Sequence, residues 1–90
     1  MKFFEWNEEK NAKLKKERGI SFDQVASKIN DKKELGVIKN PSKNFPDQKV
    51  YVVEINEYIY YVPFVENEGR IFLKTIIPSR KATKKYLQRI

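Results

Sequence analysis

The residues of this chain that are able to do chemistry are mainly basic, because its 90 residues include no histidine and no cysteine. A thiolate nucleophile, a disulfide framework and a zinc site built on cysteine or histidine are therefore excluded. A general acid or base acting near neutral pH would have to be a carboxylate, a lysine or a tyrosine in a perturbing environment. The last third of the chain contains no acidic cluster, so we expect neither a metal site nor a cofactor.

The basic residues are concentrated toward the C-terminal end. The chain holds 19 Lys and Arg against 12 Asp and Glu, which gives a net charge of +7. Residues 1–34 contribute +2, residues 35–69 contribute −2, and residues 70–90 contribute +7 without one acidic side chain. Such a block indicates a polyanionic partner, and a solvated helix that serves solubility is the alternative. Its members are Arg70, Lys74, Arg80, Lys81, Lys84, Lys85 and Arg89.

Three residues of this block have side chains that could act on a phosphodiester. Arg80 is the first choice, because a guanidinium pairs with two phosphate oxygens and the N-terminal turn of a helix also favours phosphate. Arg70 opens the last predicted strand and could reach the same surface. Lys74 lies in that strand between apolar neighbours, where partial burial would favour its neutral, basic form. A solvated or ion-paired side chain is the alternative for each.

The predicted C-terminal helix carries candidates for binding RNA. Aromatic faces among basic residues suit single-stranded RNA better than duplex DNA, because unstacked bases can stack on them. Most tyrosines in a sheet are instead core residues with one polar end. The candidates on the helix are Lys81, Lys84, Lys85 and Tyr86.

Capping signals predict the two N-terminal helices. Asn7 precedes an acidic first turn and Gly19 suits a left-handed C-cap, which predicts a helix over residues 8–18. This helix has few apolar residues, so we expect it to show a wide polar face. Ser21, with Gln24 three residues later, forms a capping box that starts a second helix.

A hydrophobic period of two predicts the sheet that follows. Pro63 cannot donate to a ladder, so it predicts an edge position or a bulge. Residues 3–6 predict a brief strand or a packed arm, and Ser79 caps a final helix over residues 80–90. Short connections favour an antiparallel meander. The expected strands cover residues 35–39, 49–55, 58–65 and 70–77.

These elements predict a single α+β domain over residues 1–90. It has two N-terminal helices, a four-stranded, twisted, mainly antiparallel sheet and a C-terminal helix. No apolar run approaches the ~18 residues of a membrane span, and no signal peptide is evident. We therefore expect a cytoplasmic protein without a membrane partner.

One motif lies near each end of the chain. The first is Phe4-Glu5-Trp6-Asn7-x-x-Lys10-Asn11, followed by Lys16-x-Arg18-Gly19-Ile20-Ser21-Phe22. The second is Pro78-Ser79-Arg80-Lys81-Ala82-Thr83. Together with the order of elements, these motifs resemble those of BrnT-type toxins, small proteins of bacterial type II toxin–antitoxin modules that are similar to the RelE superfamily of ribonucleases.

The resemblance implies a RelE-like fold, cleavage of mRNA without a metal, and a cognate antitoxin that blocks activity in a hetero-oligomeric complex. It also adds Lys10 to the catalytic candidates and Asn11 to the RNA-binding ones, since both belong to the first motif.

Two other functions stay open at this point. A non-catalytic RNA- or DNA-binding module would use the same basic block. A protein-interaction domain would bind an acidic partner through its basic surface, or through an unmatched sheet edge near residues 35–39 or Pro63. RNA cleavage by the partner-free protein separates both from the ribonuclease.

Overall fold

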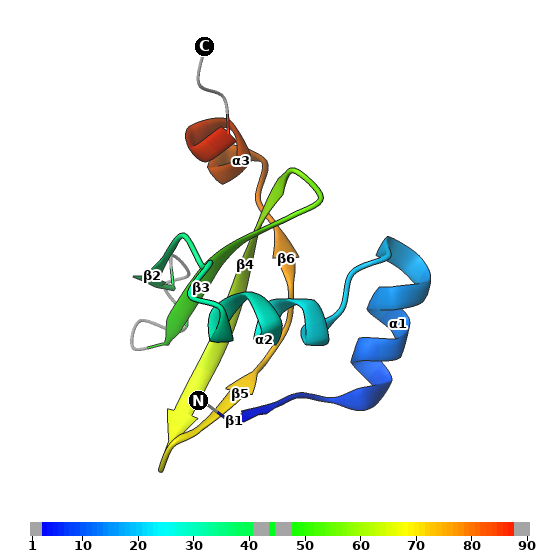
Figure 1. The fold of residues 1–90 in the computed structure, drawn as a ribbon, viewed down its shortest axis with the longest axis vertical. Helices are drawn as coiled ribbons and strands as arrows, with labels where there is room; N and C mark the ends of the chain where they lie inside the picture. The colour runs from blue at the N-terminus through cyan, green and yellow to red at the C-terminus, as the bar shows by residue number, and fades with distance from the viewer. Residues whose placement is uncertain (1–2, 41–43, 45–47, 88–90) are drawn as a thin grey trace.

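The fold places the second helix on one face of a mixed sheet and the third helix on the other, with the first helix to one side (Figure 1). It is seen in a computed structural model that describes residues 3–40, 44 and 48–87. The elements in chain order are β1 (Phe3–Glu5), α1 (Glu8–Arg18), α2 (Phe22–Asn30), β2 (Gly36–Lys39), β3 (Lys49–Ile55), β4 (Tyr58–Asn67), β5 (Arg70–Leu73), β6 (Ile77–Pro78) and α3 (Arg80–Leu87).

Local capping sets the bounds of the first two helices, as predicted. Asn7 Oδ1 accepts from Lys10 N at 3.0 Å, and α1 ends at Gly19, whose φ of 67° lies in the left-handed region. Ser21 and Gln24 form both bonds of the capping box at the start of α2. The two helices are therefore joined by a short, tightly specified turn.

The α+β class is confirmed, but the sheet has more strands than the four predicted. Its order is β1-β5-β4-β3-β2, and β6 pairs with β4 beyond the end of β5. β2 to β5 form the predicted antiparallel meander. β1 adds a parallel strand beside β5, which settles residues 3–5 as a strand. Three residues are too few for an alternation of apolar and polar side chains to distinguish a strand from a packed arm.

The predicted strand over residues 70–77 is wrong as one continuous element. Phe64 pairs with Leu73, and Tyr61 pairs with Ile77. Between these pairs β4 has two residues and the opposite strand has three, so the extra residue forms a bulge that separates β5 from β6. The bulge lies opposite Pro63, where the sequence predicted an edge or a bulge. β4 itself is an inner strand with neighbours on both sides.

Alternation along the strands divides the buried side chains between the two faces of the sheet. Tyr51, Val53, Val62 and Phe64 belong to the main core, which α2 covers with Phe22 and its other apolar residues. The opposite face carries a smaller cluster in which Val52 and Ile59 contact Ala82 of α3. We call this second side of the sheet the α3 face.

The hydroxyl of Thr83 anchors α3 to the end of β4. It accepts from Ile59 N at 2.9 Å and donates to Ser79 O at 2.7 Å. Ser79 Oγ in turn accepts from Ala82 N, which confirms the predicted N-cap. The predicted helix continued to Ile90, but residues 88–90, including Arg89, lie outside the described residues. None of the helices in the described ranges is long and apolar enough to cross a membrane.

Candidate functional site

Pro63 leaves one backbone carbonyl of the sheet without its ladder partner. Pro63 lies opposite Lys74, one position beyond the Phe64–Leu73 pair. The carbonyl oxygen of Pro63 accepts from Lys74 N at 2.8 Å. In an antiparallel pair of this kind, two residues exchange two such bonds. Proline has no N–H to donate in return. The Lys74 carbonyl is therefore available to another donor.

That donor is the side chain of Lys10. Its Nζ atom donates to Lys74 O at 3.2 Å, although the two residues are 64 positions apart in the sequence. Both side chains are exposed. The bond fixes the ammonium group of α1 at the bulge and brings two of the predicted catalytic lysines, one from each end of the chain, to the same place.

The two lysines border an open pocket of about 350 Å³. The pairing register places Pro63, Lys74 and Ile77 on the α3 face, because Ile77 lies opposite Tyr61 and Pro63 is two residues beyond it. We call this pocket the bulge pocket. It is lined by Lys10, Asn40, Gln48, Pro63, Lys74, Thr75 and Ile77.

A second hollow of about 320 Å³ lies between α1 and β6. It shares Lys10, Thr75 and Ile77 with the bulge pocket. Its α1 wall adds the cations Lys13 and Arg18, together with one acid, Glu17. The two hollows together form a mainly cationic surface along the edge of the sheet.

Arg80 lies beyond β6 as the first residue of α3 and is exposed. Pro78 pairs with Tyr60, three residues before Pro63 on β4, so this end of α3 lies roughly 10 Å from the bulge along the strand. Within residues 3–40, 44 and 48–87, no carboxylate lies at ion-pair distance from Arg80. The other basic residues of the same helix are Lys81, Lys84 and Lys85, all exposed.

Arg70 is separated from Arg80 by the length of the sheet. It lies opposite Asn67, seven residues from Tyr60 on β4, which corresponds to about 23 Å. Its Nη1 atom is 4.0 Å from Glu5 Oε2, and both side chains are exposed. The expectation that Arg70 could reach the surface of Arg80 is therefore wrong.

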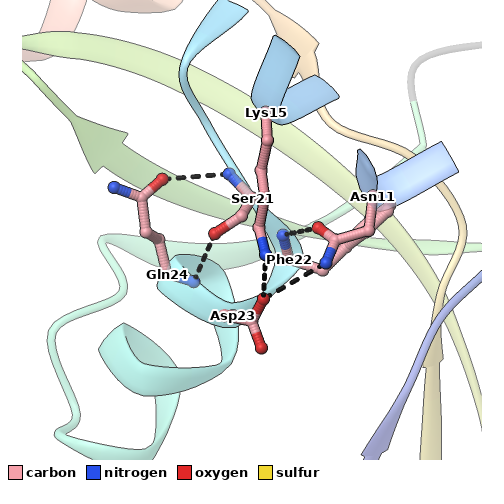
Figure 2. Close-up of polar contacts among 6 residues, drawn as sticks. All are labelled: Asn11, Lys15, Ser21, Phe22, Asp23 and Gln24. Atoms are coloured by element: carbon pink, nitrogen blue, oxygen red, sulfur yellow. Dashed lines mark hydrogen bonds and ion pairs between the residues drawn. The ribbon is translucent and has the colours of Figure 1, made fainter. Parts of the chain in front are cut away.

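Asn11 is buried and does not lie on the polar face of α1 where it was expected. Only 3% of it is exposed. Its Oδ1 atom accepts from Phe22 N at 2.8 Å, and its Nδ2 atom donates to Asp23 Oδ2 at 3.1 Å (Figure 2). Lys15 Nζ lies 3.4 Å from the same carboxylate oxygen. Asn11 thus joins α1 to the first turn of α2, and it is inaccessible to RNA.

The Asp23 carboxylate is stabilised in its charged form by this junction. The hydrogen bond from Asn11 is the largest of the effects that lower its pKa, and Lys15 contributes in the same direction. Partial desolvation opposes them. Asp23 also lies in the first turn of α2, where the helix dipole favours an anion.

Two further expectations concern Lys74 and the tyrosines. Lys74 is exposed, which agrees with the solvated side chain that the sequence left open as the alternative to a partly buried base. Tyr86 is half-buried against the α3-face cluster, and Lys85 Nζ lies 5.8 Å from the centre of its ring. Tyr51 is a core residue stacked on Phe64, and burial, more than the nearby carboxylates, raises its pKa.

The sequence did not indicate the non-basic walls of the bulge pocket. Asn40 and Gln48 flank the long loop between β2 and β3, and Thr75 and Ile77 lay within a strand that was expected to continue. Pro63 was the one available signal, since its missing N–H marked the place where the ladder had to change.

In the described part of the chain, no group of three or more acidic residues is placed to hold a metal ion. Comparisons with protein-family models, with curated proteins and with solved structures found no match. The resemblance to BrnT-type toxins rests on the two sequence motifs.

Proposed function

We propose that this chain is an endoribonuclease toxin that cleaves mRNA without a metal ion and is neutralised by a cognate antitoxin. The observation that carries the proposal is the meeting of Lys10 and Lys74 at the bulge pocket. The Lys10 ammonium group and the exposed side chain of Lys74, at an open and partly apolar pocket, suit a phosphodiester with a nucleotide attached. An open pocket of about 350 Å³ is within the range of small-molecule sites, and it suits one unstacked nucleotide of a single strand.

The reaction that these groups support is an internal phosphoryl transfer. The 2′-oxygen of one nucleotide attacks the adjacent phosphorus, and the bond to the 5′-oxygen of the next nucleotide breaks. The ammonium groups of Lys10 and Lys74 stabilise the charge that develops on the phosphorane. One of them protonates the leaving 5′-oxygen, and the proton of the 2′-hydroxyl leaves to the solvent of the open pocket. The products are a 2′,3′-cyclic phosphate and a 5′-hydroxyl.

The remaining cations extend the binding surface for RNA. Arg80 begins α3, which packs on the same face of the sheet as the bulge pocket, and the proposal assigns it a contact with a neighbouring phosphate. Lys81, Lys84 and Lys85 continue the positive charge along the helix. Because phosphate contacts release counterions, binding should weaken steeply as salt rises.

The antitoxin is proposed from the two motifs and from the net charge of +7. A protein that neutralises this surface would present carboxylates to it, which would compete directly with RNA phosphates. This arrangement predicts that the antitoxin blocks RNA cleavage and that removing the antitoxin restores it.

Cleavage by the purified, partner-free chain tests the function. A labelled single-stranded RNA is incubated with the protein in excess EDTA, with and without ribosomes. We expect fragments that end in a 2′,3′-cyclic phosphate. Lys10→Met and Lys74→Met should each lower the cleavage rate about 10²-fold, the usual effect of removing one group that stabilises a transition-state charge.

Lys16→Met is the matched control, because Lys16 is an exposed lysine on another face of α1 and lies outside both hollows. It should cleave like the wild type. Folded protein that binds RNA but never cleaves it would reject the enzyme and leave the nucleic-acid-binding module. In that case Arg80→Ala should weaken binding and reduce its salt dependence.

A further inference from the structure

We propose that the bulge pocket contains a nucleobase-binding subsite, in which the base of one RNA nucleotide lies against Pro63 and Ile77 and accepts a hydrogen bond from Gln48. The inference deepens the proposed function and rests on it for the RNA substrate. It follows from the part of the pocket wall that carries no charge.

The apolar wall has the chemistry that a base needs. Pro63 is buried in the sheet, while Ile77 is 45% exposed beside it. Both belong to the wall of a pocket of about 350 Å³, at the lower end of the roughly 300–1,000 Å³ typical of small-molecule sites. The exposed apolar surface of this wall is therefore mainly that of Ile77, with Pro63 beneath it, and covering it with the flat face of a base gains free energy.

The polar wall faces the edge of such a base. Asn40 Nδ2 donates to Gln48 Oε1 at 2.8 Å, and a backbone bond of 2.8 Å from Asn40 N to Gln48 O supports the same pair. This arrangement uses the oxygen of the Gln48 amide, so its Nε2 group is the part that can donate to a ligand. Base carbonyl oxygens and ring nitrogens are acceptors for that donor.

The two lysines add positive charge to the pocket. The pocket therefore suits a nucleotide, which carries a phosphate, rather than an uncharged apolar ligand. Lys74 lies opposite Pro63 in the register, and Lys10 is held to the Lys74 carbonyl. A base against Pro63 and Ile77 therefore has the Lys10 ammonium group and the exposed Lys74 side chain at the same pocket to bind its own phosphate. The pocket is matched to a nucleoside monophosphate unit of single-stranded RNA.

Titration of the full chain with nucleotides tests the subsite. Each of the four nucleoside 3′-monophosphates, and inorganic phosphate as the reference, is added while NMR follows the Gln48 side-chain amide and the Ile77 methyl groups. At least one nucleotide should shift these signals and bind more tightly than phosphate. Gln48→Leu should reduce the ratio of nucleotide to phosphate affinity about five- to tenfold, the usual worth of one hydrogen bond.

Ile77→Ser provides a second variant that does not disturb the Asn40–Gln48 pair, and it should reduce the same ratio. Val37→Ser is its matched control, because Val37 is 49% exposed and lies outside the pocket on β2. The control should leave the ratio unchanged.

The results separate this inference from the proposed function. Equal affinity for phosphate and all four nucleotides, or an unchanged ratio in both pocket variants, would overturn the subsite even if the protein cleaves RNA. Nucleotide binding that depends on Gln48 and Ile77 would support the subsite even if RNA is never cleaved. In that case only the proposed ribonuclease activity would be rejected.

Discussion

Two neighbouring residues of α1 supply missing hydrogen bonds in two different regions. At the α1–α2 junction, Asn11 accepts from Phe22 N, an N–H of the first turn of α2 that has no acceptor within the helix. At the bulge, Lys10 donates to the carbonyl of Lys74, which Pro63 leaves without a ladder donor. In both regions a side chain replaces a backbone partner.

The regions differ in burial, and burial separates structural from functional roles. Asn11 is 3% exposed and makes bonds at both ends of its amide, so no ligand can displace them without leaving buried groups unpaired. Lys10 is exposed and uses one donor of an ammonium that has three. It can bind the carbonyl and a phosphate together, so this position suits catalysis.

Removing the buried partner should have the largest effect. Asn11→Leu keeps the side-chain volume but leaves Phe22 N–H unpaired, so we expect the free energy of unfolding to fall by about 2–3 kcal/mol. Denaturant unfolding measures it. The cleavage rate per folded molecule should stay near that of the wild type. Lys10→Met should instead slow cleavage and change the free energy of unfolding by less than about 0.5 kcal/mol. Equal destabilisation by both variants would remove the distinction between the regions.

Restoring the missing N–H of the ladder should have the next largest effect. Pro63→Ala gives β4 a donor for the carbonyl of Lys74, which competes with Lys10 and releases its side chain. We expect cleavage to slow about tenfold, which is roughly 1.4 kcal/mol in the barrier.

A double-variant cycle shows whether this effect passes through Lys10. In the Lys10→Met background, Pro63→Ala should slow cleavage no further, because no side-chain ammonium remains to be released. Additive losses would show that Pro63 acts by shaping the pocket wall instead.

Removing the exposed charge of Asp23 at the α1–α2 junction should have the smallest effect. Because the folded pKa of Asp23 is lowered, its carboxylate stabilises the fold above the unfolded pKa of about 3.9, and this contribution is lost as the pH falls through the folded value. Asp23→Asn should lower the free energy of unfolding by less than about 1 kcal/mol at pH 6, because the ion pair with Lys15 is exposed. The difference from the wild type should vanish in acid.

Asp31→Asn serves as the reference in the same pH series, because Asp31 is exposed at the other end of α2. A difference that persists unchanged below pH 3 would show that the Asp23 variant perturbs packing rather than charge.

Features that depend on a few adjacent residues were predictable from the sequence. The bounds of α1, the left-handed Gly19 and the capping box of α2 all match the predictions. The strands with clear alternation, β2 to β4, also lie close to the expected positions. Two of the candidate residues, Lys10 and Lys74, lie together, but their separation of 64 residues gave no local sign of it.

Features that depend on which surfaces meet were not predictable. Asn11 was expected to bind RNA because it belongs to the first motif, whereas its contacts with the first turn of α2 bury it. Arg70 was expected to be able to reach the surface of Arg80, but the pairing register places the two toward opposite ends of β4.

The sequence alone therefore determined the class of fold, the helix caps, the concentration of positive charge and the absence of histidine and cysteine chemistry. These follow from residue type and short-range hydrogen bonding. The tertiary structure decided which cations lie together. Pro63 has no N–H to donate to the carbonyl of Lys74, and Lys10 from the other end of the chain donates instead. This bond can form only once the strands and α1 are in place.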